Sequence, residues 1–339
     1  MRISRRTLIA TAAAGAGAAV TATPAEAAPR KVVRPPALRP GDRVRVIAPA
    51  GVPDPVRTAR GIQILESFGL VVEQGAHLWD RFGYLAGTDQ DRLADLNAAL
   101  SDSGVKGVFA ARGGYGTQRI IDGVDLAAVR RDPRVIVGFS DLTVLSGRLW
   151  NAARLVTFYG PMVNWTDSRT GPVEIESLRK AIMTTDPIML TSDPAEPSAA
   201  VSVPGTATGT LLGGNLTMLQ TSVGTPDLPS LRGAILVFED TDEGPYSYDR
   251  MLTHLIRTGT LRRIAGVAVG QFTSAPVVSG QWTAAQAVQD RLGGLGVPVL
   301  GGLRIGHGVG QLTVPLGTRA TIDTATATLT VQPGVRATP

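Results

Sequence analysis

Short apolar runs alternate with amphipathic helical patterns along most of this 339-residue chain. The apolar runs predict buried strands. Between them, leucine or isoleucine residues repeat at helical spacing, which predicts helices. In the first half, strands are expected at residues 42–50, 70–73, 105–111 and 135–137, and helices at 56–68 and 88–101. Strands that alternate with helices predict an α/β fold whose parallel sheet is covered on both faces. Ligands of such sheets bind at the carboxyl ends of the strands.

A second unit of alternating strands and helices follows a polar, proline-containing stretch. Its expected strands lie at 207–212, 233–239, 266–272 and 297–303, and its helices at 214–222, 248–257 and 283–292. Short alternating segments at 311–314 and 318–331 suggest a terminal β ribbon. The pattern therefore predicts an amino domain at 41–165 and a carboxyl domain at 201–335. The connection between them, 166–200, is expected to carry one helix at 174–183.

The first 27 residues have the features of an export signal. Arg5-Arg6 precedes an apolar, alanine-rich run, and Ala25-Glu26-Ala27 offers a cleavage site of small residues. This combination indicates a signal peptide of the twin-arginine type rather than a spanning helix. Residues 28–40, which contain four prolines, are predicted to be an extended leader. We expect the mature protein outside the cytoplasm, in the cell envelope or secreted.

Composition excludes several function classes. The chain has no cysteine, which excludes disulfides, thiolate catalysis and thiolate metal sites. Its formal charge of +5 is spread over scattered residues, with no basic tract of the kind that binds nucleic acid. No segment after the signal peptide has the unbroken apolar length of a membrane span.

Ser140 stands where the strand 135–137 ends and a helix should begin. Gly138 permits a sharp turn before it, and Leu142, Leu145 and Leu149 follow at helical spacing. Serine nucleophiles are often placed at such a corner, where backbone N–H groups of the next helix lie close by. The alternative role for Ser140 is that of an ordinary helix N-cap.

A glycine-rich loop follows the neighbouring strand 105–111. In the loop, Arg112-Gly-Gly-Tyr-Gly116, missing side chains let backbone N–H groups approach a ligand. Its spacing matches neither the Walker loop nor the dinucleotide fingerprint. Because this loop and Ser140 both follow parallel strands, they are expected at the same edge of the sheet.

His307 and Glu239 are the candidate partners of Ser140. His307 is flanked by glycines, which would let a loop bring the imidazole close to another group, and Glu239 ends an apolar strand. The alternatives are a surface histidine, a structural ion pair, and a metal site built from Glu239, Asp240, Asp242 and Glu243. His254 falls inside an amphipathic helix and His77 has no companion motif.

A nucleophile, a general base and an orienting carboxylate can be assigned to Ser140, His307 and Glu239. The N–H of Asp141 directly follows the nucleophile and is the natural first oxyanion donor. The second is expected from the glycine-rich loop, at Gly114.

The chain resembles the LD-carboxypeptidase (muramoyltetrapeptide carboxypeptidase) family of serine peptidases, to which the microcin-immunity peptidases are related. The resemblance spans about residues 36 to 331 and rests on ordered segments: ARGGYG (111–116), GFSDLT (138–143), TFYGPM (157–162), LGGNL (212–216), ILVFED (235–240), PYSYDRML (245–252), GH (306–307) and TVPLG (313–317). It implies a Ser–Glu–His triad, which falls on Ser140, Glu239 and His307. It also implies a flavodoxin-like amino domain, a mixed β-rich carboxyl domain, and often a homodimer.

The activity that the resemblance implies is hydrolysis of the L,D bond to the terminal D-alanine of peptidoglycan stem tetrapeptides. The reaction would need no metal or cofactor. Arg112, Asn215 and Glu243 are candidates for substrate contacts, against ordinary surface or turn-supporting roles. Two other functions stay open: a related peptidase that detoxifies a peptide–nucleotide antibiotic, and a non-catalytic exported peptide-binding protein.

Overall fold

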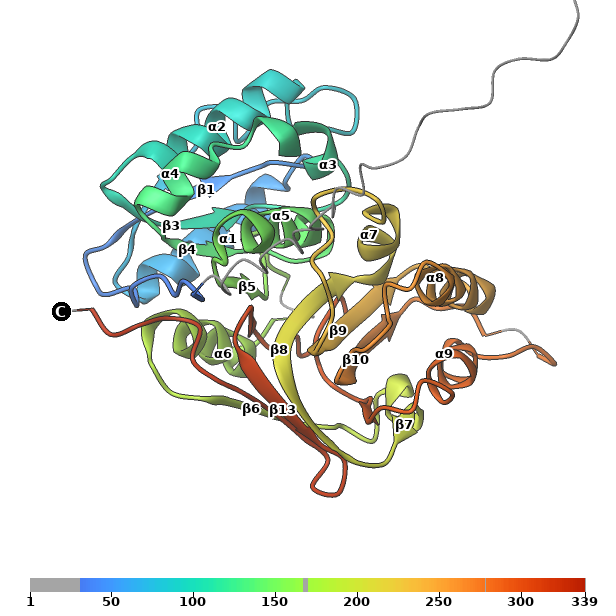
Figure 1. Ribbon diagram of the computed structural model, residues 1–339. Helices are drawn as coiled ribbons and strands as arrows, with labels where there is room; N and C mark the ends of the chain where they lie inside the picture. The colour runs from blue at the N-terminus through green and yellow to red at the C-terminus, as the bar shows by residue number, and fades with distance from the viewer. Residues whose placement is uncertain (1–30, 167–169, 278, 339) are drawn as a thin grey trace, which may run out of the picture. The chain divides into compact units, whose positions relative to one another are not determined.

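Five parallel strands form most of the first sheet in the computed structural model (Figure 1). They are β1 (Arg43–Ile47), β2 (Val71–Gln74), β3 (Val105–Ala110), β4 (Val135–Val137) and β5 (Thr157–Tyr159). The sheet order is β12-β5-β4-β3-β1-β2, in which β12 (Val314–Leu316) pairs antiparallel with β5. The parallel part thus has the doubly wound order 2-1-3-4-5 of flavodoxin-like folds, as the family resemblance implied.

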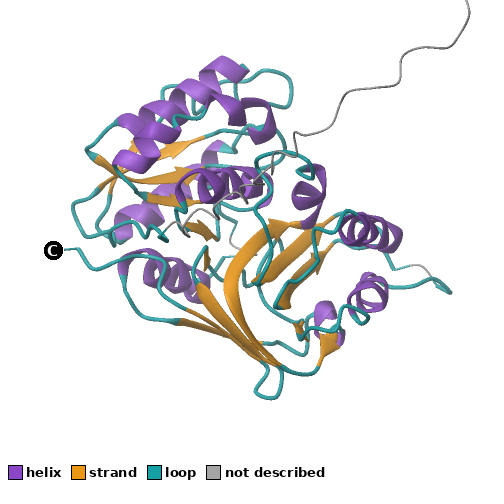
Figure 2. Ribbon diagram, in the orientation of Figure 1, coloured by secondary structure: helices purple, strands orange, loops and turns teal. Residues whose placement is uncertain are grey.

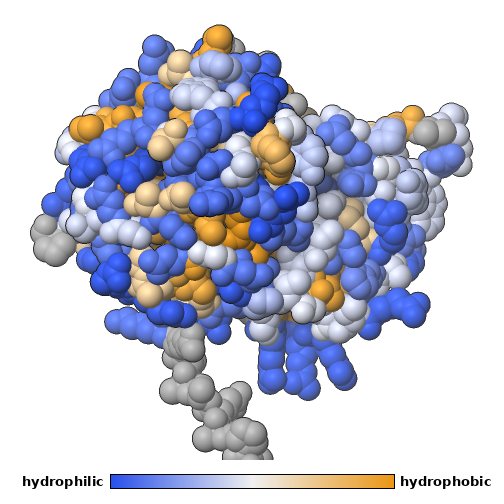
Figure 3. Space-filling model, turned by 90° about the horizontal axis from the view of Figure 1, so that it is seen from above, coloured by the Kyte–Doolittle hydropathy of each residue, from blue (hydrophilic) through white to orange (hydrophobic). Residues whose placement is uncertain are grey.

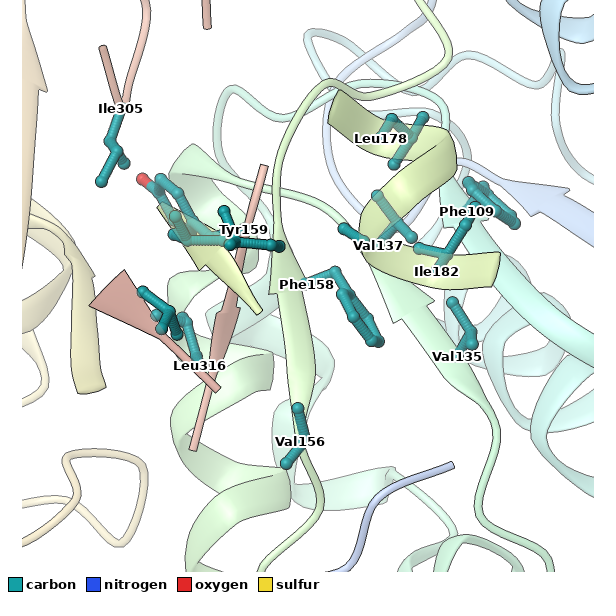
Figure 4. Close-up of a cluster of buried hydrophobic side chains, with 14 of the residues drawn as sticks. Phe109, Val135, Val137, Val156, Phe158, Tyr159, Leu178, Ile182, Ile305 and Leu316 are labelled. Atoms are coloured by element: carbon teal, nitrogen blue, oxygen red, sulfur yellow. The ribbon is translucent and has the colours of Figure 1, made fainter. Parts of the chain in front are cut away.

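Helices cover both faces of this sheet. On one face lie α1 (Pro55–Ser67) and α6 (Pro172–Met183); on the other lie α2 (Asp89–Ser101), α3 (Thr117–Ile120), α4 (Leu126–Arg131) and α5 (Thr143–Ala153). The side chains of each strand pack alternately against one helix layer and the other, because successive residues of a strand point to opposite faces of the sheet. Val135 and Val137 pack with Leu178 and Ile182 of α6 (Figure 4), while Ile136 joins the other layer.

The second sheet is mixed. Its order is β6-β14-β13-β8-β9-β10-β11-β7, and the run β8 to β11 is parallel while the other pairs are antiparallel. The strands are β6 (Ile188–Thr191), β7 (Ser202–Val203), β8 (Thr206–Asn215), β9 (Ala234–Thr241), β10 (Gly266–Thr273), β11 (Val299–Leu300), β13 (Arg319–Asp323) and β14 (Thr328–Val331). Figure 2 shows the helices that cover one side of β8 to β10: α7 (Leu216–Thr221), α8 (Pro245–Arg257) and α9 (Ala284–Leu292).

The opposite face of the second sheet shares a hydrophobic core with the first sheet. Ile235 and Val237 of β9 belong to the same buried cluster as Val137 and Phe158 of the first sheet. This shared core fixes the two sheets against each other, so that side chains from β5 and β9 meet.

Four short strands differ from the sequence prediction. β5 and β7 were not expected as strands, β6 lies inside the segment expected to be a connection, and β12 overlaps the expected ribbon segment 311–314 only at Val314. All four acquire their pairing from distant parts of the chain: β12 with β5, β6 with β14, and β7 with β11. A pairing between distant segments leaves no local periodicity to detect. The helix expected inside the connection, α6, and the terminal ribbon, β13 with β14, are confirmed.

The structure describes residues 31–166, 170–277 and 279–338. The predicted signal peptide at 1–27 and the first part of the leader lie outside these residues. Within them, the remainder of the leader runs along the core, where Val33 bridges to Leu155 and Pro36 to Arg336. None of the helices in the described ranges is long and apolar enough to cross a membrane. The face drawn in Figure 3 is largely hydrophilic, with smaller groups of hydrophobic residues.

Candidate active site

Ser140 lies at a sharp corner between β4 and the helical turn that leads into α5. Its φ angle is +60°, a left-handed conformation that side chains other than glycine rarely adopt. Such a conformation costs on the order of 1–3 kcal/mol and is typical of nucleophile-bearing turns. Phe139, not Ser140, is the N-cap of the following turn, which lacks a side-chain cap among the described residues. The geometry thus favours the nucleophile role over the cap role.

Gly138 is required by this corner. A Cβ at that position would lie 2.8 Å from the Leu142 side chain, which folds back over the turn. Gly113 is constrained in a similar way, since its Cβ would lie 3.3 Å from the Cβ of Ser140. The glycine-rich loop therefore passes directly beside the serine, as expected from the two strand ends.

The backbone around Ser140 offers hydrogen-bond donors. Among the described residues, no acceptor bonds to the N–H of Asp141 or of Gly114. Gly114 has φ +102°, which its lack of a side chain permits. These are the two N–H groups predicted from the sequence to form an oxyanion hole.

Two buried charged side chains hold the loop and the corner together. Asp141, 1% exposed, accepts a hydrogen bond from the Thr117 N–H at 2.9 Å, which ties the corner to the end of the glycine-rich loop. Burial raises the pKa of the Asp141 carboxyl. Arg92 of α2 is also buried and donates to the carbonyl oxygens of Pro49 and Gly116.

Glu239 and His307 form a close pair. The Nδ1 atom of His307 lies 2.6 Å from Oε2 of Glu239, whose side chain is fully buried near the end of β9. A neutral imidazole that donates from Nδ1 carries its lone pair on Nε2, the tautomer a general base needs. The ring also contacts Phe139, with centroids 4.7 Å apart.

Gly306 makes this pair possible. Its φ is +132°, and a Cβ there would lie 2.6 Å from Oε2 of Glu239. The flanking Gly308 lies against Gln271, whose Oε1 accepts its N–H at 2.9 Å. The sequence expectation that glycines would bring the imidazole close to another group is confirmed.

The other oxygen of Glu239 has two further donors. Tyr159 donates its hydroxyl to Oε1 at 2.6 Å, and Asn215 contributes a longer contact at 3.4 Å. Asn215 also bonds to Asp240 at 2.7 Å and accepts the Met218 N–H at the start of α7. Burial, together with the nearby Glu239, raises the pKa of Asp240 to about 6.

A cleft of about 720 Å³ opens over this arrangement, a size that suits a small-molecule or peptide ligand. Ser140, His307, Gly114 and Arg112 all line it. The guanidinium of Arg112 donates to the Val52 carbonyl at 2.7 Å, and this bond fixes it in the wall of the cleft.

Two candidate substrate contacts are not brought to the cleft. Asn215 and Glu243 are absent from the described residues that line it. The side chain of Asn215 is buried and its hydrogen bonds run to protein groups, which favours the turn-supporting role.

The acidic run at 239–243 does not form a cation site within the described residues. Glu239 and Asp240 direct their carboxylate oxygens at N–H and O–H donors, which a cation would have to displace. Across the same residues, a grouping with metal-ligand spacing occurs elsewhere, at His77, Asp80 and Asp91. The remaining histidine, His254, bonds to Gln220 at 2.8 Å in a packing role.

Comparison with known proteins identifies the family. The model of the LD-carboxypeptidase N-terminal domain matches residues 44–160, and that of the C-terminal domain matches residues 208–322. The chain belongs to the LD-carboxypeptidase family. This LD-carboxypeptidase family member is therefore a hydrolase of the carboxypeptidase type, as the resemblance implied.

Named relatives of the chain match most of its length. The protein named probable murein peptide carboxypeptidase of Bacillus subtilis (strain 168) is 38% identical over 307 residues, which cover 89% of this chain and 95% of that protein. A muramoyltetrapeptide carboxypeptidase of known structure from Oxalobacter formigenes is 28% identical, with a TM-score of 0.77, and covers 87% of this chain and 100% of that one.

The fold extends to a further solved structure. The microcin C7 self immunity protein MccF, in complex with aspartyl sulfamoyl adenosine, has a TM-score of 0.81 at 21% identity, covering 90% of this chain and 100% of that one. This likeness concerns the fold.

One residue of the site was missed from the sequence. Tyr159 lies in a segment that matched the family, yet nothing in its local pattern marked the hydroxyl. The regular alternation of strands and helices could have indicated it, because that alternation predicts a fifth strand after α5. The end of that strand, where Tyr159 lies, would then be expected beside Ser140.

Proposed function

We propose that the protein releases the terminal D-alanine of peptidoglycan stem tetrapeptides through a serine-linked acyl-enzyme. The observation that carries the proposal is the 2.6 Å bond between His307 and Glu239, in the same site as a serine at a strained strand–helix corner. The names of the Bacillus subtilis and Oxalobacter formigenes relatives support the substrate class.

In the first half of the reaction, Oγ of Ser140 attacks the carbonyl carbon that precedes D-alanine. His307 takes the hydroxyl proton on Nε2, and Glu239 stabilises the imidazolium that forms. The negative charge on the carbonyl oxygen is met by the N–H groups of Asp141 and Gly114, each worth roughly 3 kcal/mol of transition-state stabilisation. The C–N bond then breaks, and His307 returns the proton to the departing amine.

In the second half, water replaces D-alanine. His307 accepts a proton from the water while the water oxygen attacks the carbonyl carbon of the acyl ester on Ser140, which gives a second tetrahedral intermediate. This intermediate then breaks the ester bond, and His307 returns the proton to Oγ of Ser140. The shortened peptide leaves with a new carboxylate. Arg112 on the cleft wall is the proposed partner of the substrate's terminal carboxylate.

The test is D-alanine release from L-Ala-γ-D-Glu-meso-diaminopimelate-D-Ala. Ser140→Ala should lower the rate by at least about 10⁴-fold. Ser146→Ala, on the helix that follows, removes a hydroxyl outside the site and should leave the rate unchanged. Equal rates for wild type and Ser140→Ala would refute the assignment.

The alternative substrate class is a peptide–nucleotide conjugate, of the kind that the solved MccF complex with aspartyl sulfamoyl adenosine contains, and the same assay separates it. An acyl-adenylate analogue that carries an aspartyl group on a hydrolysable bond replaces the tetrapeptide. Our proposal expects cleavage of the tetrapeptide at a much higher kcat/KM. Preferential cleavage of the nucleotide conjugate would reassign the substrate, and tight binding of either without turnover would indicate a binding protein.

We also propose that the protein works outside the cytoplasm, where it would trim the cell wall itself. Arg5-Arg6 and the apolar run after it support export by the twin-arginine route. Replacing both arginines with lysine should keep the protein in the cytoplasmic fraction. Unchanged export of that variant would contradict the route.

A further inference from the structure

The hydroxyl of Tyr159 lies between the nucleophile corner and the buried carboxylate. It donates to Oε1 of Glu239 at 2.6 Å and accepts the N–H of Ser140, with N and O 3.2 Å apart. Tyr159 is fully buried and is not among the described residues that line the cleft. One oxygen atom thus links the backbone of Ser140 to the carboxylate that holds His307.

Packing fixes the tyrosine ring in this place. Tyr159 ends β5, which lies next to β4, the strand that leads to Ser140. Figure 4 shows Phe158 and Tyr159 pointing to opposite sides of β5, with the hydroxyl of Tyr159 near Ile305. The ring packs edge-to-face against Phe139, with the ring centroids 5.9 Å apart and an angle of 80° between the ring planes. Because Gly214 has no side chain, the ring can lie against its backbone; a Cβ there would be 3.0 Å from it.

The direction of the two hydrogen bonds follows from their chemistry. A phenol carries one proton, which the carboxylate of Glu239 accepts, whereas the N–H of Ser140 is itself a donor. Burial and the neighbouring negative charge raise the pKa of Tyr159 well above its usual range. The hydroxyl therefore keeps its proton, and its donation to Glu239, over the whole pH range in which a hydrolase works.

Both bonds act on atoms that the reaction uses. With Oε1 occupied by Tyr159, Oε2 is the oxygen presented to Nδ1 of His307. At the other end, the bond to the Ser140 N–H supports a residue held at φ +60°. Because the N–H of Ser140 is already bonded to Tyr159, it is not available to a substrate oxyanion. The proposed oxyanion donors are therefore the N–H groups of Asp141 and Gly114.

We propose that Tyr159 is a positioning residue, which holds the nucleophile corner and the Glu239–His307 pair in the relative placement that hydrolysis requires. The kinetic part of this inference rests on the proposed function above. The structural part, that Tyr159 orders the Glu239–His307 pair, does not depend on the substrate.

The test compares Tyr159→Phe with Tyr248→Phe. Each change removes one buried hydroxyl and keeps the ring, but no described residue bonds to the hydroxyl of Tyr248. Tyr159→Phe should lower kcat for D-alanine release roughly 10- to 100-fold, as expected for a lost bond to a charged group. KM should change less than about twofold, because Tyr159 does not reach the cleft. Tyr248→Phe should leave both constants near the wild-type values.

The pH profile adds a readout that loss of packing alone would not move. The ionisable groups around Glu239 are His307, Asp240 and Tyr248, with Asp242 further along the chain. Removing a donor from the carboxylate leaves its negative charge less stabilised, so the proton of the His307–Glu239 pair is held more tightly. The acid limb of kcat/KM should therefore move to higher pH in Tyr159→Phe and stay in place in Tyr248→Phe.

A proton NMR measurement tests the structural part without any substrate. A short bond from an imidazole N–H to a carboxylate gives a low-field proton resonance, which we expect in the wild type and in Tyr248→Phe. It should shift or broaden in Tyr159→Phe. Wild-type kcat, an unmoved acid limb and an unchanged resonance in Tyr159→Phe would overturn the proposal.

Two further outcomes are separated by this design. If the wild type releases no D-alanine, the proposed function fails, while the resonance still supports or overturns the role of Tyr159. If Tyr159→Phe does not fold, Tyr159→3-fluorotyrosine keeps the hydroxyl and makes it a stronger donor. The resonance of that variant should move, and an unmoved resonance would overturn the proposal.

Discussion

Glu239 is a carboxylate removed from water, and the site is arranged to compensate for that removal. An isolated buried charge is costly unless hydrogen bonds replace its hydration. Here the replacement comes from His307 and Tyr159 at 2.6 Å each, with Asn215 further away. Because these donors come from different strands and loops, the carboxylate connects parts of the chain that are far apart in sequence.

Asp240, the next residue, makes stability depend on pH. Its pKa is raised from 3.8 to about 6 in the folded protein, mainly by burial. The folded state therefore binds the proton more tightly than the unfolded state does. This contribution to stability is fully present below about pH 4 and is lost as the pH rises through about 6.

We predict that the free energy of unfolding of the wild type falls relative to Asp240→Asn by up to about 3 kcal/mol between pH 4 and pH 7. The asparagine cannot titrate, so the difference isolates Asp240. Denaturant unfolding at a series of pH values measures it. Asp242→Asn, at an exposed position, should parallel the wild type. A flat difference for Asp240→Asn would contradict the pKa shift.

At the residue scale, the sequence predicted those site residues whose positions follow from local patterns. Ser140 could be placed from a strand, a glycine and a helix, and His307 from its flanking glycines. Tyr159 could not be assigned, because its role depends on contacts with Ser140 and Glu239 that only the folded chain creates. Asn215 was considered for substrate binding, yet its amide bonds to Asp240 inside the protein.

At the scale of elements, α2 supports the site through its start and one buried side chain. Thr88 caps the helix in a capping box with Asp91. One turn later, Arg92 reaches the carbonyl oxygens of Pro49 and Gly116. The helix thus anchors the glycine-rich loop from behind.

Loss of the cap should destabilise the protein without altering the chemistry. We predict that Thr88→Ala lowers the free energy of unfolding by about 1 kcal/mol. Thr283→Ala removes the matching capping box of α9 and should cost a similar amount. Thermal or denaturant unfolding measures both. No loss in either variant would mean that the caps contribute nothing to stability.

Elements with their own periodicity were predicted well, and those defined by pairing were not. The helices α1, α2, α8 and α9 and the long strands β9 and β10 carry enough residues for a pattern to stand out. β5 and β12 have three residues each, and they pair across more than 150 positions of sequence. Their existence is a property of the sheet that they complete.

On the scale of the whole molecule, the chain crosses between its two sheets more than once. After β11 it supplies His307, adds β12 to the first sheet, and returns to the second sheet as β13 and β14. This path explains why the two sheets share one core and why the site draws on both. The sequence predicted two domains that follow one another along the chain. The segment 314–331 contributes strands to both sheets, so the sheets are not each built from one continuous stretch of chain.

The central claim is that Ser140 and His307, one from each half of the chain, act as a single unit. The most direct test is kcat/KM for D-alanine release by wild type, Ser140→Ala, His307→Ala and the double variant. We predict that each single change costs roughly 10⁴- to 10⁶-fold and that the double variant loses little more than either. Losses that multiply in the double variant, or activity in Ser140→Ala within tenfold of the wild type, would contradict the account.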